Sequence, residues 1–93
     1  MAKLVPGHIK TRQLQLLAEL RQTGSVLHAA QALGMSQSAA SRLLGSLEQE
    51  IGAPLFERHA RGVMPTVFGE IVTRRAVSAL AEISRAAAEV DEV

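Results

Sequence analysis

The sequence predicts a small, mainly α-helical domain that carries one short β-hairpin and ends in a long helix. Three observations favour this fold class. The 93 residues are 47% hydrophobic but only 2% aromatic, and much of the apolar content is alanine and leucine, which suits packing of helix on helix. Glycines divide the first half of the chain into segments with helical apolar spacing. After Leu55 the period changes, which indicates a pair of strands.

The first two helices are predicted over residues 9–22 and 26–33. Gly24 provides a stop for the first helix, and Ser25 is a favourable N-cap for the second. Gly34 suits the left-handed position that follows a helix end. The first helix rests on four apolar residues at helical spacing, namely Ile9, Leu14, Leu17 and Leu20.

A third helix is predicted over residues 37–51. Ser36 is placed to cap its start, and Gly52 followed by Pro54 ends it. Two helices joined by a turn of about three residues that contains a glycine match the helix-turn-helix pattern.

The last third of the chain predicts a wing over about residues 55–65 and a long fourth helix from residue 67, capped by Thr66. Residues 1–66 are therefore expected to form a winged helix-turn-helix domain, and residues 67–93 a dimerisation or linker helix. The fourth helix carries a narrow apolar seam, which needs a partner. The seam residues, expected at the dimer interface, are Val72, Ala76, Ala79, Ile83, Ala86 and Val90.

The third helix has two distinct faces when its residues are advanced by 100° each. Ala40, Leu43, Leu44, Leu47 and Ile51 form the stripe expected to be buried. The opposite face is neutral or basic, with no acidic residue before Glu48. It consists of Gln37, Ser38, Ser41, Arg42, Gly45, Ser46 and Gln49.

A DNA major groove fits such a face, because phosphates repel carboxylates while amide and guanidinium groups pair with base edges. We expect Gln37 and Arg42 to read bases. The short hydroxyls near the helix start are suited to positioning on the phosphate backbone, and these are Ser36, Ser38 and Ser41.

The wing adds three candidate contacts. Arg61 beside Gly62 is placed to enter a minor groove, although a solvated turn arginine is the plainer alternative. Arg58 is equally suited to a structural role or to a phosphate, and His59 to solvent or a phosphate. For the third helix the plainer alternative is an ordinary amphipathic helix with a solvated polar face.

Several function classes are disfavoured. The chain has no cysteine, which excludes disulfides and thiolate metal sites, and no run long or apolar enough for a signal peptide or membrane span, so we expect a cytoplasmic protein without membrane contact. His8, His28 and His59 are far apart, and no motif supplies a base for a serine nucleophile. We expect no enzyme, no metal and no cofactor.

The charge is uneven along the chain. Residues 1–66 carry seven Lys and Arg against four Glu, whereas residues 67–93 carry three Arg against five acidic residues. A basic front is a weak indication of a polyanion partner. The rival interpretation is a helical protein-interaction or adaptor module that pairs through residues 67–90. It accounts for the apolar seam of the fourth helix but not for the polar face of the third helix, which has no acidic residue before Glu48.

The sequence resembles the N-terminal domain of LysR-type transcriptional regulators. The resemblance implies a dimer that binds double-stranded DNA at an interrupted palindrome, with Gln37, Ser38, Ser41 and Arg42 facing the groove and Arg61 on the wing. It is carried in order by Arg12-Gln13-Leu14, Gly24-Ser25, Ala29-Ala30, Leu33, Ser36-Gln37, Ser41, Leu47-Glu48, Gly52, Leu55-Phe56, Arg58, Arg61-Gly62, Thr66 and Gly69.

Three positions depart from the family pattern: Leu27 replaces the usual threonine, Ser38 the usual proline and Pro65 the usual leucine. Members of this family resemble one another in a second, larger domain that binds a small effector. We expect that domain to be absent from these 93 residues, so any small-molecule effector would bind outside them.

Overall fold

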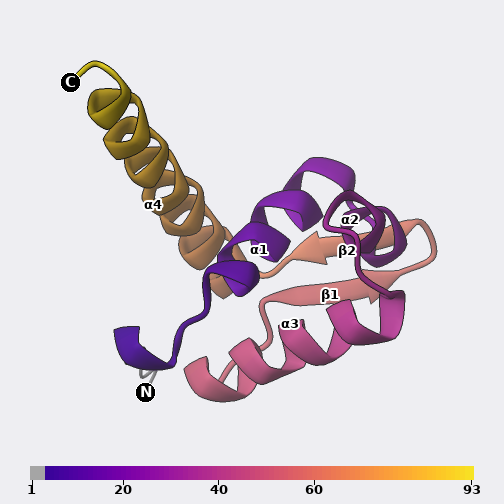
Figure 1. Ribbon diagram of the computed structural model, residues 1–93. Helices are drawn as coiled ribbons and strands as arrows, with labels where there is room; N and C mark the ends of the chain where they lie inside the picture. Colours follow the sequence, from indigo (N-terminus) through magenta and orange to yellow (C-terminus); the bar gives the residue numbers. More distant parts are fainter. Residues whose placement is uncertain (1–3) are drawn as a thin grey trace.

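The computed structural model describes residues 4–93 and contains four α-helices, one short 3-10 helix and one hairpin in that part of the chain. In Figure 1, α1, α2 and α3 gather around the hairpin, whereas α4 runs away from this body as a single rod. The mainly α fold with a wing and a long last helix is confirmed. The elements are the 3-10 helix Pro6–His8, α1 Thr11–Thr23, α2 Val26–Ala32, α3 Gln37–Ile51, β1 Phe56–His59, β2 Gly62–Pro65 and α4 Val67–Asp91.

The first helix starts two residues later than the apolar spacing predicts. Ile9 lies outside α1, in extended backbone after the 3-10 turn. The helix begins at Thr11 because the side-chain oxygen of Gln13, which is only 3% exposed, accepts a hydrogen bond of 2.8 Å from the Lys10 N–H. That bond satisfies a backbone donor at the helix start, a position where donors have no partner within the helix.

The helix-turn-helix unit is built from local signals. Ser25 caps α2 by accepting from the His28 N–H, and Ser36 caps α3 by accepting from the Ala39 N–H at 3.1 Å. The turn between them contains Gly34 in the left-handed conformation, at a φ of 67°. The sequence-predicted stripe of α3 is buried except for Leu43, which is half-buried.

The hairpin is tied to the turn between α1 and α2. Phe56 pairs with Pro65 and His59 with Gly62 in an antiparallel register, which leaves Ala60 and Arg61 as a two-residue loop. The Val63 N–H donates to the Gly24 carbonyl at 3.0 Å, so the wing is fixed to the helical body as well as to itself.

Two side chains fix the segment that joins α3 to the wing and α4. The Glu48 carboxylate accepts from the Leu55 N–H at 2.7 Å and from the Phe56 N–H at 3.4 Å. The Thr66 hydroxyl donates to the Pro54 carbonyl at 2.7 Å and accepts from the Gly69 N–H, which caps α4. The orientation of the wing relative to α3 therefore depends on a carboxylate of α3 itself.

The first half of α4 packs on the body, and the second half projects from it. Gly69, Thr73 and Ala76 are buried, and every residue beyond Leu80 is exposed. Ala76 was predicted at the dimer interface, but it is 2% exposed and belongs to the domain's own core. The sequence-predicted seam is wrong at this position because the helix turns its Gly69–Ala76 side toward α1 and Leu55.

One hydrophobic core joins α1, α2, α3, the hairpin and the start of α4. Its largest fully buried apolar side chains are leucines with at most 1% exposure, and each is worth about 2 kcal/mol when buried. They are Leu16, Leu17, Leu20, Leu47 and Leu55. Within residues 4–93, none of the helices has both the length and the apolar content that a bilayer crossing requires.

Candidate nucleic-acid interface

The solvent-facing side of α3 gathers the residues that the sequence singled out. Gln37, Ser38 and Arg42 are exposed, and Ser41 is half-buried. Ser36 is exposed too, but its hydroxyl is engaged in the cap of α3 and lies 3.3 Å from the Ser38 hydroxyl. The long polar side chains of Gln37 and Arg42 are thus presented to solvent from a helix whose other side is anchored in the core.

The wing reaches this face through Arg58. Its guanidinium donates to the Ser41 hydroxyl at 3.4 Å, across 17 residues of sequence. The contact places a cation of β1 beside the middle of α3, so Arg58 belongs to the same surface as Ser41 and Arg42. Sequence spacing alone gave no basis for this pairing, because it arises from the packing of the hairpin on α3.

A polar hollow of about 280 Å³ lies between the start of α2, the start of α3 and the hairpin. It brings Gln37 of α3 together with Arg58 and His59 of β1, and Leu27 of α2 lines it as well. Leu27 is 45% exposed, so the residue that departs from the family pattern presents an apolar side chain at the edge of the candidate interface.

At the wing tip, Ala60 lines the hollow but Arg61 does not. Arg61 is exposed in the two-residue loop, and its N–H donates to His59 Nδ1 at 3.3 Å. Gly62 follows at a φ of 136°, and a Cβ there would lie 2.1 Å from the Gly24 carbonyl oxygen. The close approach of wing and body at Gly62 fixes the base of the loop that carries Arg61.

The acidic residues of α3 are engaged with the chain itself. Glu48 binds the backbone of Leu55 and Phe56, and the Glu50 carboxylate lies 2.6 Å from His8 Nδ1. Neither carboxylate is carried by the first two turns of α3, where Gln37 and Arg42 lie. The first two turns of α3 therefore present neutral hydrogen-bond donors and guanidinium groups. Such a surface favours binding of a polyanion.

No contact within the described residues 4–93 requires a glycine at position 45. A Cβ built there meets nothing within 4 Å, and its backbone does not have a positive φ. A glycine inside a helix costs about 1 kcal/mol relative to alanine. Gly45 lies on the same side of α3 as Ser38, Ser41 and Arg42, so its missing side chain leaves that face open for a close approach.

Among residues 4–93, no group of three or more His, Cys, Asp or Glu side chains is arranged to hold a metal ion. His28 is exposed on α2.

Comparison with known proteins gives one family. The model described as bacterial regulatory helix-turn-helix protein, lysR family, matches residues 11–70. The HTH-type transcriptional regulator GbpR of Azospirillum brasilense is 42% identical over 87 residues, which are 94% of this chain and 25% of that protein. The chain spans about a quarter of the length of these curated relatives, which include GbpR of Rhizobium radiobacter.

Solved structures agree in fold. The crystal structure of the CbnR DBD–DNA complex superimposes with a TM-score of 0.82 at 27% identity, covering 90% of this chain and 97% of that one. The complex of the BenM DBD with benA site 1 DNA gives a TM-score of 0.84 at 26% identity, covering 90% and 94%. In both cases the matching protein is bound to DNA.

Proposed function

The chain belongs to the LysR family of bacterial regulatory helix-turn-helix proteins, and from this we infer that it is the DNA-binding region of a transcriptional regulator. It binds duplex DNA with sequence preference, with α3 in the major groove and the β1–β2 wing at the minor groove. The family is one of regulators and not of enzymes. We propose that the protein acts in the cytoplasm, where bacterial DNA lies.

The observation that carries this proposal is the solvent-facing side of α3. Arg42 and Gln37 extend from it and are suited to hydrogen bonds with guanine and adenine edges, respectively. Ser36, Ser38 and Ser41 remain proposals for backbone positioning. This proposal is supported by their short hydroxyl side chains near the start of the helix, which suit contacts with the DNA backbone.

The wing contributes charge rather than base recognition in this proposal. Arg58 and His59 line the polar hollow beside Gln37, which suits a phosphate of the strand that α3 follows. Arg61 at the loop is placed to enter the neighbouring minor groove, where the negative potential attracts guanidinium groups.

We further propose a homodimer in which two α4 helices pack antiparallel, so that two α3 helices enter two half-sites of an interrupted palindrome. Its support is the exposed apolar side of the projecting half of α4, where Ile83 is 72% and Val90 71% exposed. Ala79 and Ala86 lie on the same side, and Val72 is half-buried. An effector would bind outside these 93 residues, as in the larger domain that such regulators carry.

Selection of duplexes from a random pool, followed by footprinting, tests the DNA-binding proposal and gives the half-site spacing. The selected duplex should bind with an affinity that falls steeply as salt is raised, because bound phosphates release counterions. A helical adaptor that pairs through residues 67–90 would show no salt-dependent binding to duplex DNA. That result would contradict the proposed function.

Alanine at Arg42 and alanine at Arg61 should weaken binding in different ways. Arg42→Ala is expected to cost about 1–3 kcal/mol on the selected site and to relax preference at the contacted base pair. Arg61→Ala should weaken binding to all duplexes and reduce the slope of affinity against salt by about one. Anisotropy titrations at several salt concentrations separate the two effects, and equal losses on all sequences for both variants would refute the division of roles.

Alanine at Gly45 should have opposite effects on stability and on binding. The free energy of unfolding is expected to rise by about 0.5–1 kcal/mol, because alanine is the better helix former and meets no neighbour. Affinity for DNA should fall about tenfold, since the added methyl group intrudes on the face that approaches the groove.

The matched control for Gly45→Ala is Ser78→Ala on α4, an exposed helical site away from the interface. It should gain some stability and leave DNA affinity unchanged. Thermal unfolding and anisotropy measure both quantities. If Gly45→Ala binds as tightly as the parent protein, the glycine has no role in DNA approach.

A further inference from the structure

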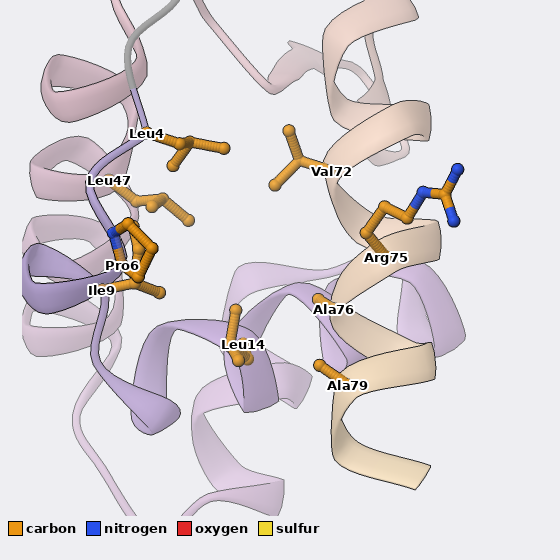
Figure 2. A pocket seen from close by; sticks show the side chains of 9 residues that line it. All are labelled: Leu4, Pro6, Ile9, Leu14, Leu47, Val72, Arg75, Ala76 and Ala79. Atoms are coloured by element: carbon orange, nitrogen blue, oxygen red, sulfur yellow. The ribbon is translucent and has the colours of Figure 1, made fainter. Parts of the chain in front are cut away.

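Two hollows on the surface of the domain differ in the side chains that line them. The larger, of about 370 Å³, has apolar walls from residues 4–9 and α4, and Figure 2 shows the guanidinium of Arg75 directed away from these walls. The smaller, of about 280 Å³, is lined by Gln37, Arg58 and His59 together with Leu27. The smaller hollow thus places a large apolar side chain among groups that are suited to DNA.

Leu27 lies outside the hydrophobic core. The buried side of α2 consists of Val26, Ala29 and Ala30, each at most 5% exposed, whereas Leu27 is 45% exposed and is not among the apolar residues that pack against the core. A single exposed leucine is common on protein surfaces and indicates little by itself. What distinguishes Leu27 is its place in the hollow beside Gln37.

The groups around Leu27 indicate how a DNA strand would lie in the hollow. On the wing side, Arg58 supplies a guanidinium group. His59 Nδ1 accepts from the Arg61 N–H at 3.3 Å, so the neutral ring carries its proton on Nε2, which can donate to a phosphate. The wing side therefore suits the sugar-phosphate backbone, while Gln37 on the α3 side suits a base edge.

A thymine places a methyl group between these two positions. Its C5-methyl group projects into the major groove and lies nearer to the backbone of its own strand than the O4 acceptor does. Leucine can neither donate nor accept a hydrogen bond through its side chain, so Leu27 can contribute to binding only by apolar contact. Of the four bases of DNA, only thymine presents a methyl group for such a contact.

We propose that Leu27 is a specificity-determining residue that contacts the C5-methyl group of a thymine next to the base pair read by Gln37. Neighbouring base pairs are about 3.4 Å apart, and both side chains line one small hollow, so they reach adjacent positions. The inference rests on the DNA binding proposed above. It adds a second reading element to that proposal, because Leu27 belongs to α2 and not to α3.

The family resemblance gives this proposal its contrast. Threonine is usual at position 27 in the family, and a threonine hydroxyl at this place suits a hydrogen bond to a phosphate, which carries no sequence information. Leucine cannot make that bond. The exchange therefore moves the contact of α2 from the DNA backbone to a base, and it should give this chain a thymine preference that a threonine variant does not share in full.

The test is a scan in which each thymine of the selected duplex is replaced in turn by deoxyuridine, which lacks only the C5-methyl group. The base pair read by Gln37 is located first, as the position where Gln37→Ala relaxes base preference. Uracil at the neighbouring position should lower the affinity of the parent chain about fourfold, the value of one buried methyl group. Anisotropy titrations at one fixed salt concentration measure each affinity.

Variants at position 27 assign the effect to the leucine. Leu27→Asn keeps nearly the same size without the methyl groups, and it should bind the thymine and uracil duplexes equally. Leu27→Met stays apolar and should retain most of the difference. Any effect of uracil on the duplex itself is common to all these proteins, so the difference between parent and Leu27→Asn isolates the contact.

The matched control is Val77→Asn, which makes the same change at 41% exposure on α4. It should keep the full fourfold preference for thymine over uracil. Circular dichroism should show the parent fold in all these variants, because neither Leu27 nor Val77 belongs to the hydrophobic core.

Several results would overturn the role of Leu27. Equal sensitivity to uracil in the parent and in Leu27→Asn would mean that another residue reads the methyl group. An equal loss of affinity for all sequences in Leu27→Asn would place the leucine on the backbone instead. A selected site without thymine beside the pair read by Gln37 would contradict the inference as well. In each case a parent chain that still prefers its selected site leaves the proposed function intact, whereas a chain that binds all duplexes alike ends both.

5-Methylcytosine gives a second readout. Replacing the predicted thymine and its partner adenine by cytosine and guanine should lower affinity, because the methyl group is lost. Adding the C5-methyl group back to that cytosine should recover about fourfold in the parent chain and nothing in Leu27→Asn. Absence of recovery in the parent chain would overturn the methyl contact.

Discussion

Replacing Gly69 by alanine is expected to destabilise the protein by about 3 kcal/mol and to lower its melting temperature by roughly 15 °C. A Cβ at this position would lie 1.8 Å from the Leu55 carbonyl oxygen and 2.8 Å from the Leu55 carbonyl carbon. These are backbone atoms, which cannot rotate away as the end of a flexible side chain would.

The backbone at Leu55 is also poorly able to retreat. Its N–H is bound to Glu48 at 2.7 Å, and its carbonyl accepts from the Thr66 N–H at 2.9 Å. Moving Leu55 would break the link between α3 and the wing, and moving α4 would uncover Thr73 and Ala76. We therefore expect the strain to appear as lost stability rather than as a small local shift.

Thermal unfolding followed by circular dichroism measures the effect of Gly69→Ala. Gly45→Ala is the matched control, because it makes the same change inside a helix where a Cβ meets nothing within 4 Å. The two variants should shift the melting temperature in opposite directions. A Gly69→Ala protein as stable as the parent would show that α4 can separate from Leu55 without loss.

The sequence was sufficient where the structure is determined locally. The caps at Ser25, Ser36 and Thr66 form the side-chain hydrogen bonds expected of them, and α3 has the expected bounds. Each of these features depends on residues three or four positions apart. Helical spacing and capping chemistry contain that information in full.

The sequence was misleading where one helix has two environments. Ala76 and Ile83 share the apolar seam of α4, yet Ala76 is buried in the protein's own core and Ile83 is 72% exposed. Periodicity shows that a face is apolar but not what covers it. The close approach of Gly69 to Leu55 spans 14 residues of sequence, and no local spacing indicates it.

The candidate interface shows the same division. The helical period placed Gln37, Ser38 and Arg42 together on one face of α3, and their exposure agrees with that placement. The approach of Arg58 to Ser41 and the anchoring of the wing by Glu48 are tertiary contacts that no helical spacing encodes. These contacts could be identified only from the folded structure.

Aspartate at Ile83 is expected to have the largest effect on DNA recognition. We expect the dimer to be lost and affinity for a complete palindromic site to fall at least about 100-fold, because the second half-site would no longer be held at high effective concentration. Affinity for an isolated half-site should stay unchanged. Ile83 is 72% exposed on a projecting helix, so the monomer has no structural reason to unfold.

Fluorescence anisotropy on full-site and half-site duplexes, at one fixed salt concentration, measures both affinities. Ala81→Asp is the matched control, because it adds the same charge two residues away on the opposite side of α4. Ala81→Asp should still bind the full site more tightly than the half-site, as Ile83→Asp should not. Of the two residues, only Ile83 belongs to the apolar seam of α4. If both variants lose that advantage equally, added negative charge near the DNA is the cause. If neither loses it, α4 does not join the two copies, and the spacing of half-sites must be set elsewhere in the domain.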